Sequence, residues 1–209
     1  MRPKVDYLRI SLTDRCQLRC VYCMPPEGID KVAHKDILTF EEIIRVVRAS
    51  IGVGITRFRL TGGEPLARRG VVDLVEEMGR LEGIDDLSLT TNGLELPGYA
   101  RRLRAAGIRR VNISLDSVNP DTYRRITRGG ELSRARAGIE AACQAAFEAV
   151  KLNAVILKGI NEGDIFPLLE FARRKAIPIR FIEMMPISTP EIGGEERFIS
   201  VDDIKERIA

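Results

Sequence analysis

The sequence lacks a membrane-spanning stretch, a signal peptide and an excess of charge. No apolar run approaches the roughly 18 residues that a membrane helix needs, and the first residues have no apolar stretch typical of a leader. The 33 Lys and Arg are nearly balanced by 30 Asp and Glu, which leaves a net charge of +3. Such a balance is not typical of a dedicated nucleic-acid binder. We therefore expect a soluble, cytoplasmic protein without a membrane or nucleic-acid partner.

Cysteine is also scarce, and its placement is uneven. There are four cysteines in 209 residues, and Cys16, Cys20 and Cys23 fall within one short segment, while Cys143 stands alone. Crowded cysteines are poorly placed for structural disulfides, and a cytosolic chain keeps its thiols reduced. A metal site is therefore the better interpretation of the three. Cys143 lies in an apolar helical stretch, where a free cysteine behaves as a small hydrophobic residue.

The rest of the composition is that of a globular protein, with 44% hydrophobic and 30% charged residues. We expect a single domain over residues 1–209. Apolar, β-branched runs alternate with amphipathic stretches, a pattern typical of an α/β fold built from βα units. The expected strands are 7–13, 57–61, 86–91, 110–115, 150–157 and 179–184. The expected helices are 40–50, 71–81, 98–106, 132–149 and 164–175, with another from about residue 201.

This alternation alone fits both a doubly wound sheet and a partial (βα)6 TIM-like barrel. Unusual residues follow the predicted strands: the cysteines, Gly62-Gly63-Glu64-Pro65, Thr90-Thr91-Asn92-Gly93, Ser114-Leu115-Asp116 and Glu183-Met184-Met185. In barrels, chemistry collects in the loops just after the strands. The partial barrel is therefore the favoured fold. The stretch 188–194 is expected to be an exposed loop.

The segment Cys16-Gln17-Leu18-Arg19-Cys20-Val21-Tyr22-Cys23 has the pattern CxxxCxxC. Three thiolates from one loop can hold three corners of a cubane iron–sulfur cluster and leave the fourth iron open. Arg15 and Arg19 would favour the thiolate form. Structural zinc is the alternative, but it normally has four protein ligands, and the only histidine, His34, lies in a polar stretch where we expect a surface residue.

Each of the other features also has a purely structural explanation. Gly62-Gly63 could form only a tight turn, Met184-Met185 could pack in the core, and Ser114 and Asp116 could cap a following helix. Their joint placement after successive strands favours a shared site.

Two motifs together resemble the radical S-adenosylmethionine superfamily: the CxxxCxxC loop with Tyr22 before its last cysteine, and Gly62-Gly63-Glu64-Pro65 after the second strand. More narrowly, the chain resembles the molybdenum-cofactor biosynthesis protein A family, the GTP 3′,8-cyclases. The stretches that carry this resemblance are 8–16, 22–25, 59–66, 89–93, 111–116, 158–161 and 180–186.

The resemblance implies a lyase that turns GTP into 3′,8-cyclo-7,8-dihydroguanosine 5′-triphosphate, the first step of molybdenum cofactor biosynthesis. It implies a [4Fe-4S] cluster on Cys16, Cys20 and Cys23, and a 5′-deoxyadenosyl radical that takes hydrogen from the ribose. The implied contacts to S-adenosylmethionine are Tyr22, Gly62, Gly63, Glu64, Ser114 and Met185. The implied contacts to GTP are Arg9, Arg59, Thr90 and Lys151. Arg9, Arg59 and Lys151 lie in predicted strands, where buried cations would need a counter-charge. An electron donor and a homodimer are also implied.

The chain departs from this family in one respect. The family has a C-terminal segment with three further cysteines for a second cluster that holds the guanine, and the four cysteines here cannot build it. We therefore expect a fragment with little or no cyclase activity, because substrate positioning is worth up to about 7–11 kcal/mol. Two alternatives remain: another radical enzyme, for example one that modifies a peptide, and a non-catalytic iron–sulfur or zinc binding module.

Overall fold

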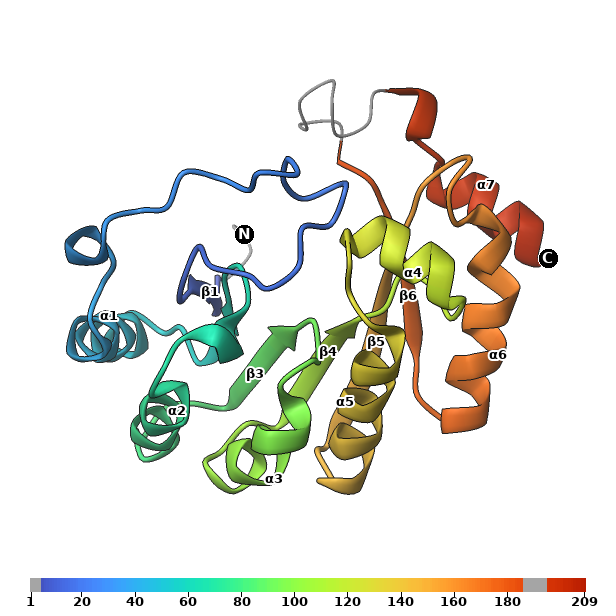
Figure 1. Cartoon of the computed structure of the whole chain (residues 1–209). Coiled ribbons are helices and arrows are strands. Elements are labelled where there is room, and N and C mark those ends of the chain that lie inside the picture. Colours follow the sequence, from blue (N-terminus) through green and yellow to red (C-terminus); the bar gives the residue numbers. More distant parts are fainter. Residues whose placement is uncertain (1–4, 186–194) are drawn as a thin grey trace. The chain divides into compact units, whose positions relative to one another are not determined.

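The computed structural model describes residues 5–185 and 195–209. Six strands alternate with helices along the chain (Figure 1) and follow one another in the sheet in sequence order. The strands are β1 Tyr7–Ser11, β2 Arg57–Thr61, β3 Asp86–Thr91, β4 Arg110–Ser114, β5 Ala149–Ile156 and β6 Ile179–Glu183. The pairs β1–β2, β2–β3 and β5–β6 are parallel. The fold is α/β, of the partial TIM-barrel type with six βα units.

The helices fill the intervals between strands. They are α1 Phe40–Gly52, α2 Val71–Gly79, α3 Leu96–Ala105, α4 Pro120–Thr127, α5 Leu132–Gln144, α6 Ile165–Lys175 and α7 Val201–Ile208. Four short 3-10 helices are also described: η1 His34–Asp36, η2 Pro65–Ala67, η3 Glu162–Asp164 and η4 Glu195–Arg197.

The chain forms two compact units that are interleaved in the sequence. The first unit contains the described residues through Cys16, together with Lys31–Asn112 and Ala137–Val150. The second unit contains Gln17–Asp30, Ile113–Arg136 and the described residues from Lys151 onward. The boundary passes through β4 and β5 and also through the cysteine segment. The prediction of a single domain remains a prediction.

In the first unit, strand alternation separates an apolar face from a polar one. Phe58, Leu60 and Leu89 are fully buried, and in parallel register Leu60 pairs with Ile10 on β1. Their neighbours along each strand point to the other face, because strand side chains alternate. Helix α1 begins with a capping box, in which Thr39 accepts from the Glu42 amide.

The second unit repeats this separation on β5. Leu152, Ala154 and Ile156 are fully buried, and the residues between them are partly exposed. Helix α6 packs against β6, as does α7. The α7 start is fixed by Ser200, which accepts from the Asp203 amide in a second capping box.

The predicted elements agree with the structure to within two residues at nearly every bound. Strand β1 ends at Ser11, two residues earlier than predicted. The helix predicted to reach residue 149 ends at Gln144, because Ala146 adopts a left-handed conformation with φ of 55° and β5 begins at Ala149. Helix α4 was not predicted. The loop predicted at 188–194 lies outside the described residues, and so does the side chain of His34.

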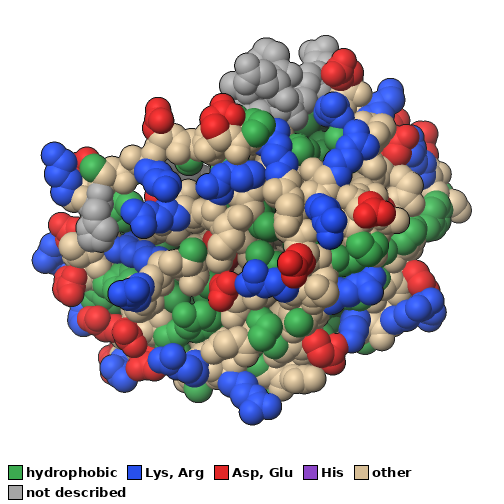
Figure 2. All heavy atoms as spheres, viewed as in Figure 1, with side chains coloured by type: hydrophobic (Ala, Val, Ile, Leu, Met, Phe, Trp, Pro, Cys, Tyr) green, Lys and Arg blue, Asp and Glu red, His purple; other side chains and the backbone are tan. Residues whose placement is uncertain are grey.

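Among the described helices, none combines the length and the apolarity that crossing a membrane would need. Figure 2 shows Lys and Arg side chains interspersed with Asp and Glu over the visible face, which agrees with the small net charge.

Candidate functional site

The cysteine segment is divided between the two units. Cys16 belongs to the first unit and Cys20 and Cys23 to the second. In the second unit the Cys23 amide donates to the Cys20 carbonyl over 2.8 Å, so the two residues flank one tight turn. Cys23 is exposed and Cys20 is partly exposed. None of the four cysteines, all of which are described, is joined in a disulfide.

Polar groups around the thiols suit thiolate ligands. In the first unit the Asn92 side-chain amide donates to the Cys16 sulfur over 3.8 Å. Arg19 in the second unit lies directly before Cys20. Three thiols are, by their chemistry, the donor set that the sequence pattern predicts for an iron–sulfur cluster.

The geometry alone does not define a metal site. Within the described part of the chain, no three His, Cys, Asp or Glu side chains are gathered closely enough to form a metal-binding group. The cluster assignment therefore depends on the CxxxCxxC pattern and remains a prediction.

The Gly62-Gly63-Glu64 segment is bonded to the chain that leads into Cys16. The Gly63 amide donates to the Thr13 carbonyl over 2.6 Å, and the Glu64 amide donates to the Arg15 carbonyl over 2.7 Å. A side chain does not fit at either glycine: a Cβ on Gly62 would lie 2.5 Å from the Thr13 carbonyl oxygen, and one on Gly63 would meet that of Arg15. The two glycines therefore serve a close backbone approach, which is more than a tight turn requires.

The Glu64 side chain is committed to the protein. It is 1% exposed, and its carboxylate accepts from the Thr91 hydroxyl and the Asn92 amide, both over 2.7 Å, and from the Leu66 amide over 3.0 Å. Burial raises its pKa, although these hydrogen bonds oppose the shift. Its contact with S-adenosylmethionine remains a prediction. The observed role of Glu64 is to join the ends of β2 and β3.

Tyr22 lies in the second unit and is bonded to a buried acid. Its hydroxyl donates to Asp116 Oδ2 over 2.7 Å. The side chain as a whole is partly exposed, but its hydroxyl lies deep, and burial together with the Asp116 carboxylate raises its pKa. Asp116 does not cap α4 as one interpretation of the sequence allowed, since the cap is Asn119, which accepts from the amides of Asp121 and Thr122.

The other residues predicted to contact S-adenosylmethionine in this unit are Ser114 and Met185. Ser114 ends β4 and is partly exposed. Met185 follows β6 and is 65% exposed, whereas Met184 is 2% exposed. Core packing thus explains Met184 and does not explain Met185.

The residues predicted to bind GTP are less buried than the sequence suggested. Arg9 is exposed and Arg59 and Lys151 are partly exposed, because these strand positions lie on the polar face. In the first unit Arg9 pairs in register with Arg59, and Arg59 with Ser88, so the three share one face, with Thr90 two residues further along β3. Arg59 donates to the Ser88 hydroxyl over 3.3 Å. These side chains form a polar, cationic row.

Two neighbours of Lys151 in the second unit were not singled out as site residues. Asn153 is two residues further along the same face of β5 and pairs in register with Arg180 on β6. The Asn153 Oδ1 atom is buried without a hydrogen-bond partner in the described residues. Its signal in the sequence was weak, because one polar residue in an apolar strand identifies no chemistry.

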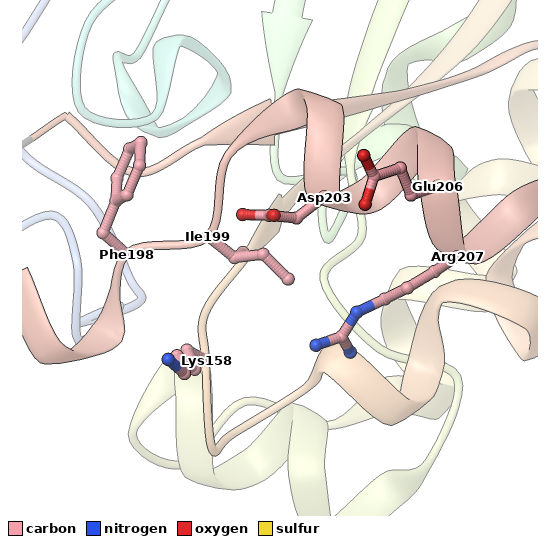
Figure 3. A pocket seen from close by; sticks show the side chains of 6 residues that line it. All are labelled: Lys158, Phe198, Ile199, Asp203, Glu206 and Arg207. Carbon is pink, nitrogen blue, oxygen red and sulfur yellow. The ribbon is translucent and has the colours of Figure 1, made fainter.

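A cavity elsewhere in the second unit contains none of the predicted site residues. It has a volume of about 330 Å³ and is lined by Lys158, Phe198, Ile199, Asp203, Glu206 and Arg207 (Figure 3). The carboxylates of α7 and the two cations offset each other, so its charge favours neither anions nor cations.

The chain is similar in sequence to a known superfamily and to known enzymes. The chain matches the Radical SAM superfamily over residues 10–172. It is 48% identical over 204 residues to a GTP 3′,8-cyclase of Alkaliphilus oremlandii, with 98% of this chain and 64% of the relative covered. It is 48% identical over 206 residues to a GTP 3′,8-cyclase of Moorella thermoacetica, with 99% of this chain and 64% of the relative covered. The chain thus spans slightly less than two thirds of the length of these relatives.

Among solved structures, Streptococcus suis SuiB bound to precursor peptide SuiA superposes with a TM-score of 0.80 at 17% identity. The match covers 98% of this chain and 45% of SuiB. At this identity the likeness concerns the fold alone. With its cysteine segment, its glycine segment and a superfamily match over most of its length, this chain belongs to the Radical SAM superfamily.

Proposed function

We propose that the chain is the barrel part of a GTP 3′,8-cyclase of molybdenum cofactor biosynthesis. The observation that carries the proposal is 48% identity to GTP 3′,8-cyclases over 98% of the chain. The cationic row supports it: Arg9 and Arg59 share one face of the first unit, and guanidinium groups suit phosphate oxygens. Because the chain spans 64% of that relative, the activity, the GTP substrate, the electron donor and a homodimer are all proposals for this chain.

In this proposal Cys16, Cys20 and Cys23 hold the [4Fe-4S] cluster. When bound, the cluster and S-adenosylmethionine supply the one-electron chemistry that starts a radical reaction. The chain's own residues bind and orient S-adenosylmethionine and the substrate. The Gly62-Gly63 backbone, Tyr22, Ser114 and Met185 contact S-adenosylmethionine, and Glu64 keeps the glycine segment in place through its bonds to β3.

GTP is held in this proposal by four side chains: Arg9, Arg59, Thr90 and Lys151. A triphosphate provides the counter-charge for three cations whose strand positions leave them partly or fully exposed to a ligand. Multiple charge-assisted bonds of this kind favour a nucleoside triphosphate over a neutral substrate.

The proposed function is tested in two steps on this chain. After anaerobic reconstitution with iron and sulfide, electron paramagnetic resonance is recorded with and without S-adenosylmethionine, and 5′-deoxyadenosine is assayed. A signal that shifts on adding S-adenosylmethionine, together with cleavage, supports the radical site. Absence of both contradicts it.

The substrate is tested by thermal unfolding with GTP. A ligand at about 100 times its Kd stabilises a protein by about 2.7 kcal/mol, so GTP should raise the unfolding temperature and Arg59→Met should remove that rise. Arg48→Met, at an exposed position of α1, is the matched control and should leave it intact. Protection by GTP distinguishes the cyclase from a peptide-modifying radical enzyme, and S-adenosylmethionine cleavage distinguishes both from a binding module.

A further inference from the structure

The carboxylate of Asp116 is buried in the second unit, and both of its oxygens accept hydrogen bonds. Asp116 follows β4 and is 3% exposed. Its Oδ2 accepts from the Tyr22 hydroxyl over 2.7 Å, and its Oδ1 accepts from the Val155 amide over 2.8 Å. A buried acid is retained only where such bonds compensate for lost hydration. The side chain therefore links the cysteine segment to β5.

The backbone of Asp116 is fixed as well. The Asn161 side-chain amide, 1% exposed, donates to the Asp116 carbonyl over 2.7 Å and to the Val155 carbonyl over 2.9 Å. Its oxygen accepts from the Leu157 amide over 2.7 Å. Both N–H groups of this side chain are thus hydrogen-bonded, one to the backbone of Asp116 and one to the backbone of Val155. The carboxylate that receives Tyr22 is held from two sides.

The hydrogen bond to Asp116 fixes the orientation of the Tyr22 ring, which the backbone hydrogen bonds of this segment leave free. The Val21 amide donates to the Ile126 carbonyl at the end of α4 over 2.8 Å, which attaches the segment but leaves the Tyr22 ring free to rotate. Tyr22 stands between Cys20 and Cys23 in the sequence, and besides burial and Asp116 the charges of both cysteines act on its hydroxyl and raise its pKa. A hydrogen bond to an ionised partner is roughly twice as strong as a neutral one.

We propose that Asp116 is a positioning residue for S-adenosylmethionine, because it holds the Tyr22 ring in the orientation that receives that molecule. The inference rests on the proposed function, in which Tyr22 contacts S-adenosylmethionine. Asp116 acts through Tyr22 and not on the reacting atoms. Its loss should therefore weaken S-adenosylmethionine binding more than it slows cleavage at saturation.

The first test needs no cluster. Amide hydrogen exchange of residues 17–24 is measured by mass spectrometry in the unmodified chain, Tyr22→Phe, Asp116→Ala and Asp116→Asn. Tyr22→Phe and Asp116→Ala should each speed exchange there about tenfold, the effect of losing one hydrogen bond to a charged group. Asp116→Asn, which keeps an acceptor for Val155, should show a smaller effect. The double variant should exchange no faster than Asp116→Ala, because both changes remove the same bond.

The matched control is Asp86→Asn. Asp86 is another buried acid, 7% exposed, at the amino end of β3, where it pairs with Arg110. This variant should leave exchange of residues 17–24 unchanged. If Asp116→Ala does not fold, Tyr22→Phe and Asp116→Asn carry the same test.

The second test uses the reconstituted chain. Asp116→Asn and Tyr22→Phe should raise the KM for S-adenosylmethionine about tenfold and change the rate of 5′-deoxyadenosine formation at saturation less than about threefold. Additive effects in the double variant, unchanged exchange at residues 17–24, or a rate lost at saturation with an unchanged KM would each overturn the proposal. If the unmodified chain cleaves no S-adenosylmethionine, the proposed function fails, and the exchange measurement still decides whether Asp116 holds Tyr22.

Discussion

At the scale of single residues, Asp116 predicts a pH dependence of stability. Burial raises the pKa of its carboxyl from 3.8 to about 6 in the folded chain. Below pH 3.8 the carboxyl of Asp116 is protonated in both the folded and the unfolded chain. As pH rises, the unfolded chain releases its proton first, so the stability that the protonated carboxyl contributes is lost by about pH 6.

This shift corresponds to about 3 kcal/mol of unfolding free energy. Denaturant unfolding of the chain without a cluster should therefore show a fall between about pH 4 and 7, and Asp116→Asn should show a smaller fall. The difference between the two curves is the measurement, since other groups titrate equally in both. Parallel curves across this range would show that burial of Asp116 is not linked to folding.

A second prediction at this scale concerns Gly63. The bond from the Gly63 amide to the Thr13 carbonyl brings the backbones so close that a Cβ would meet the Arg15 carbonyl. Gly63→Ala should therefore lower the unfolding free energy by about 1–3 kcal/mol, the usual cost of overpacking. Gly98→Ala is the matched control, because a Cβ there meets nothing within 4 Å. Equal unfolding midpoints for the two variants would contradict the close approach.

At the scale of elements, helix α4 supports the cysteine segment. The Arg19 amide donates to the Thr127 carbonyl over 3.1 Å at the end of this helix. Arg128, which ends α4 in a left-handed conformation with φ of 53°, donates from Nη1 to the Met24 carbonyl over 2.7 Å and to the Arg19 carbonyl over 3.3 Å. A non-glycine residue is strained in this conformation. These hydrogen bonds offset the free-energy cost of that backbone strain.

Arg128→Ala should therefore lower the unfolding free energy by about 1–2 kcal/mol, the value of hydrogen bonds from a charged donor that is partly exposed. It should also speed hydrogen exchange of residues 17–28. Arg125→Ala, at an exposed position of the same helix, should change stability by less than about 0.5 kcal/mol. If Arg125→Ala has the larger effect, α4 does not act through Arg128.

The sequence did not predict α4, for a physical reason. The helix has eight residues, and only Tyr123, Ile126 and Thr127 are buried, too few for a periodic apolar pattern. Asp116 and Ser117 resembled a helix start, yet Asp116 bonds Tyr22, and Asn119 provides the cap. The longer elements were predictable because their buried positions repeat with the period of a strand or a helix.

At the scale of the whole molecule, the cysteine inventory predicts the metal content. Three thiolates hold one cubane cluster, so anaerobic reconstitution should give about four irons per chain. Cys143→Ser should retain this content, because Cys143 belongs to α5 and not to the CxxxCxxC segment. Cys20→Ser should lower the iron content strongly. Retention of iron in Cys20→Ser, measured by iron and sulfide analysis, would contradict the assignment.

The alternation of strands and helices and the motifs that follow the strands could be predicted from the sequence, because both are local in the chain. The sequence also indicated the superfamily through Cys16, Cys20, Cys23 and the glycine segment. The folded structure was needed to show that Glu64 bonds the end of β3, that Tyr22 is hydrogen-bonded to Asp116, and that Arg9 is exposed. Residues as far apart as 22 and 116 meet through folding, and no local pattern encodes which buried oxygen will face which donor.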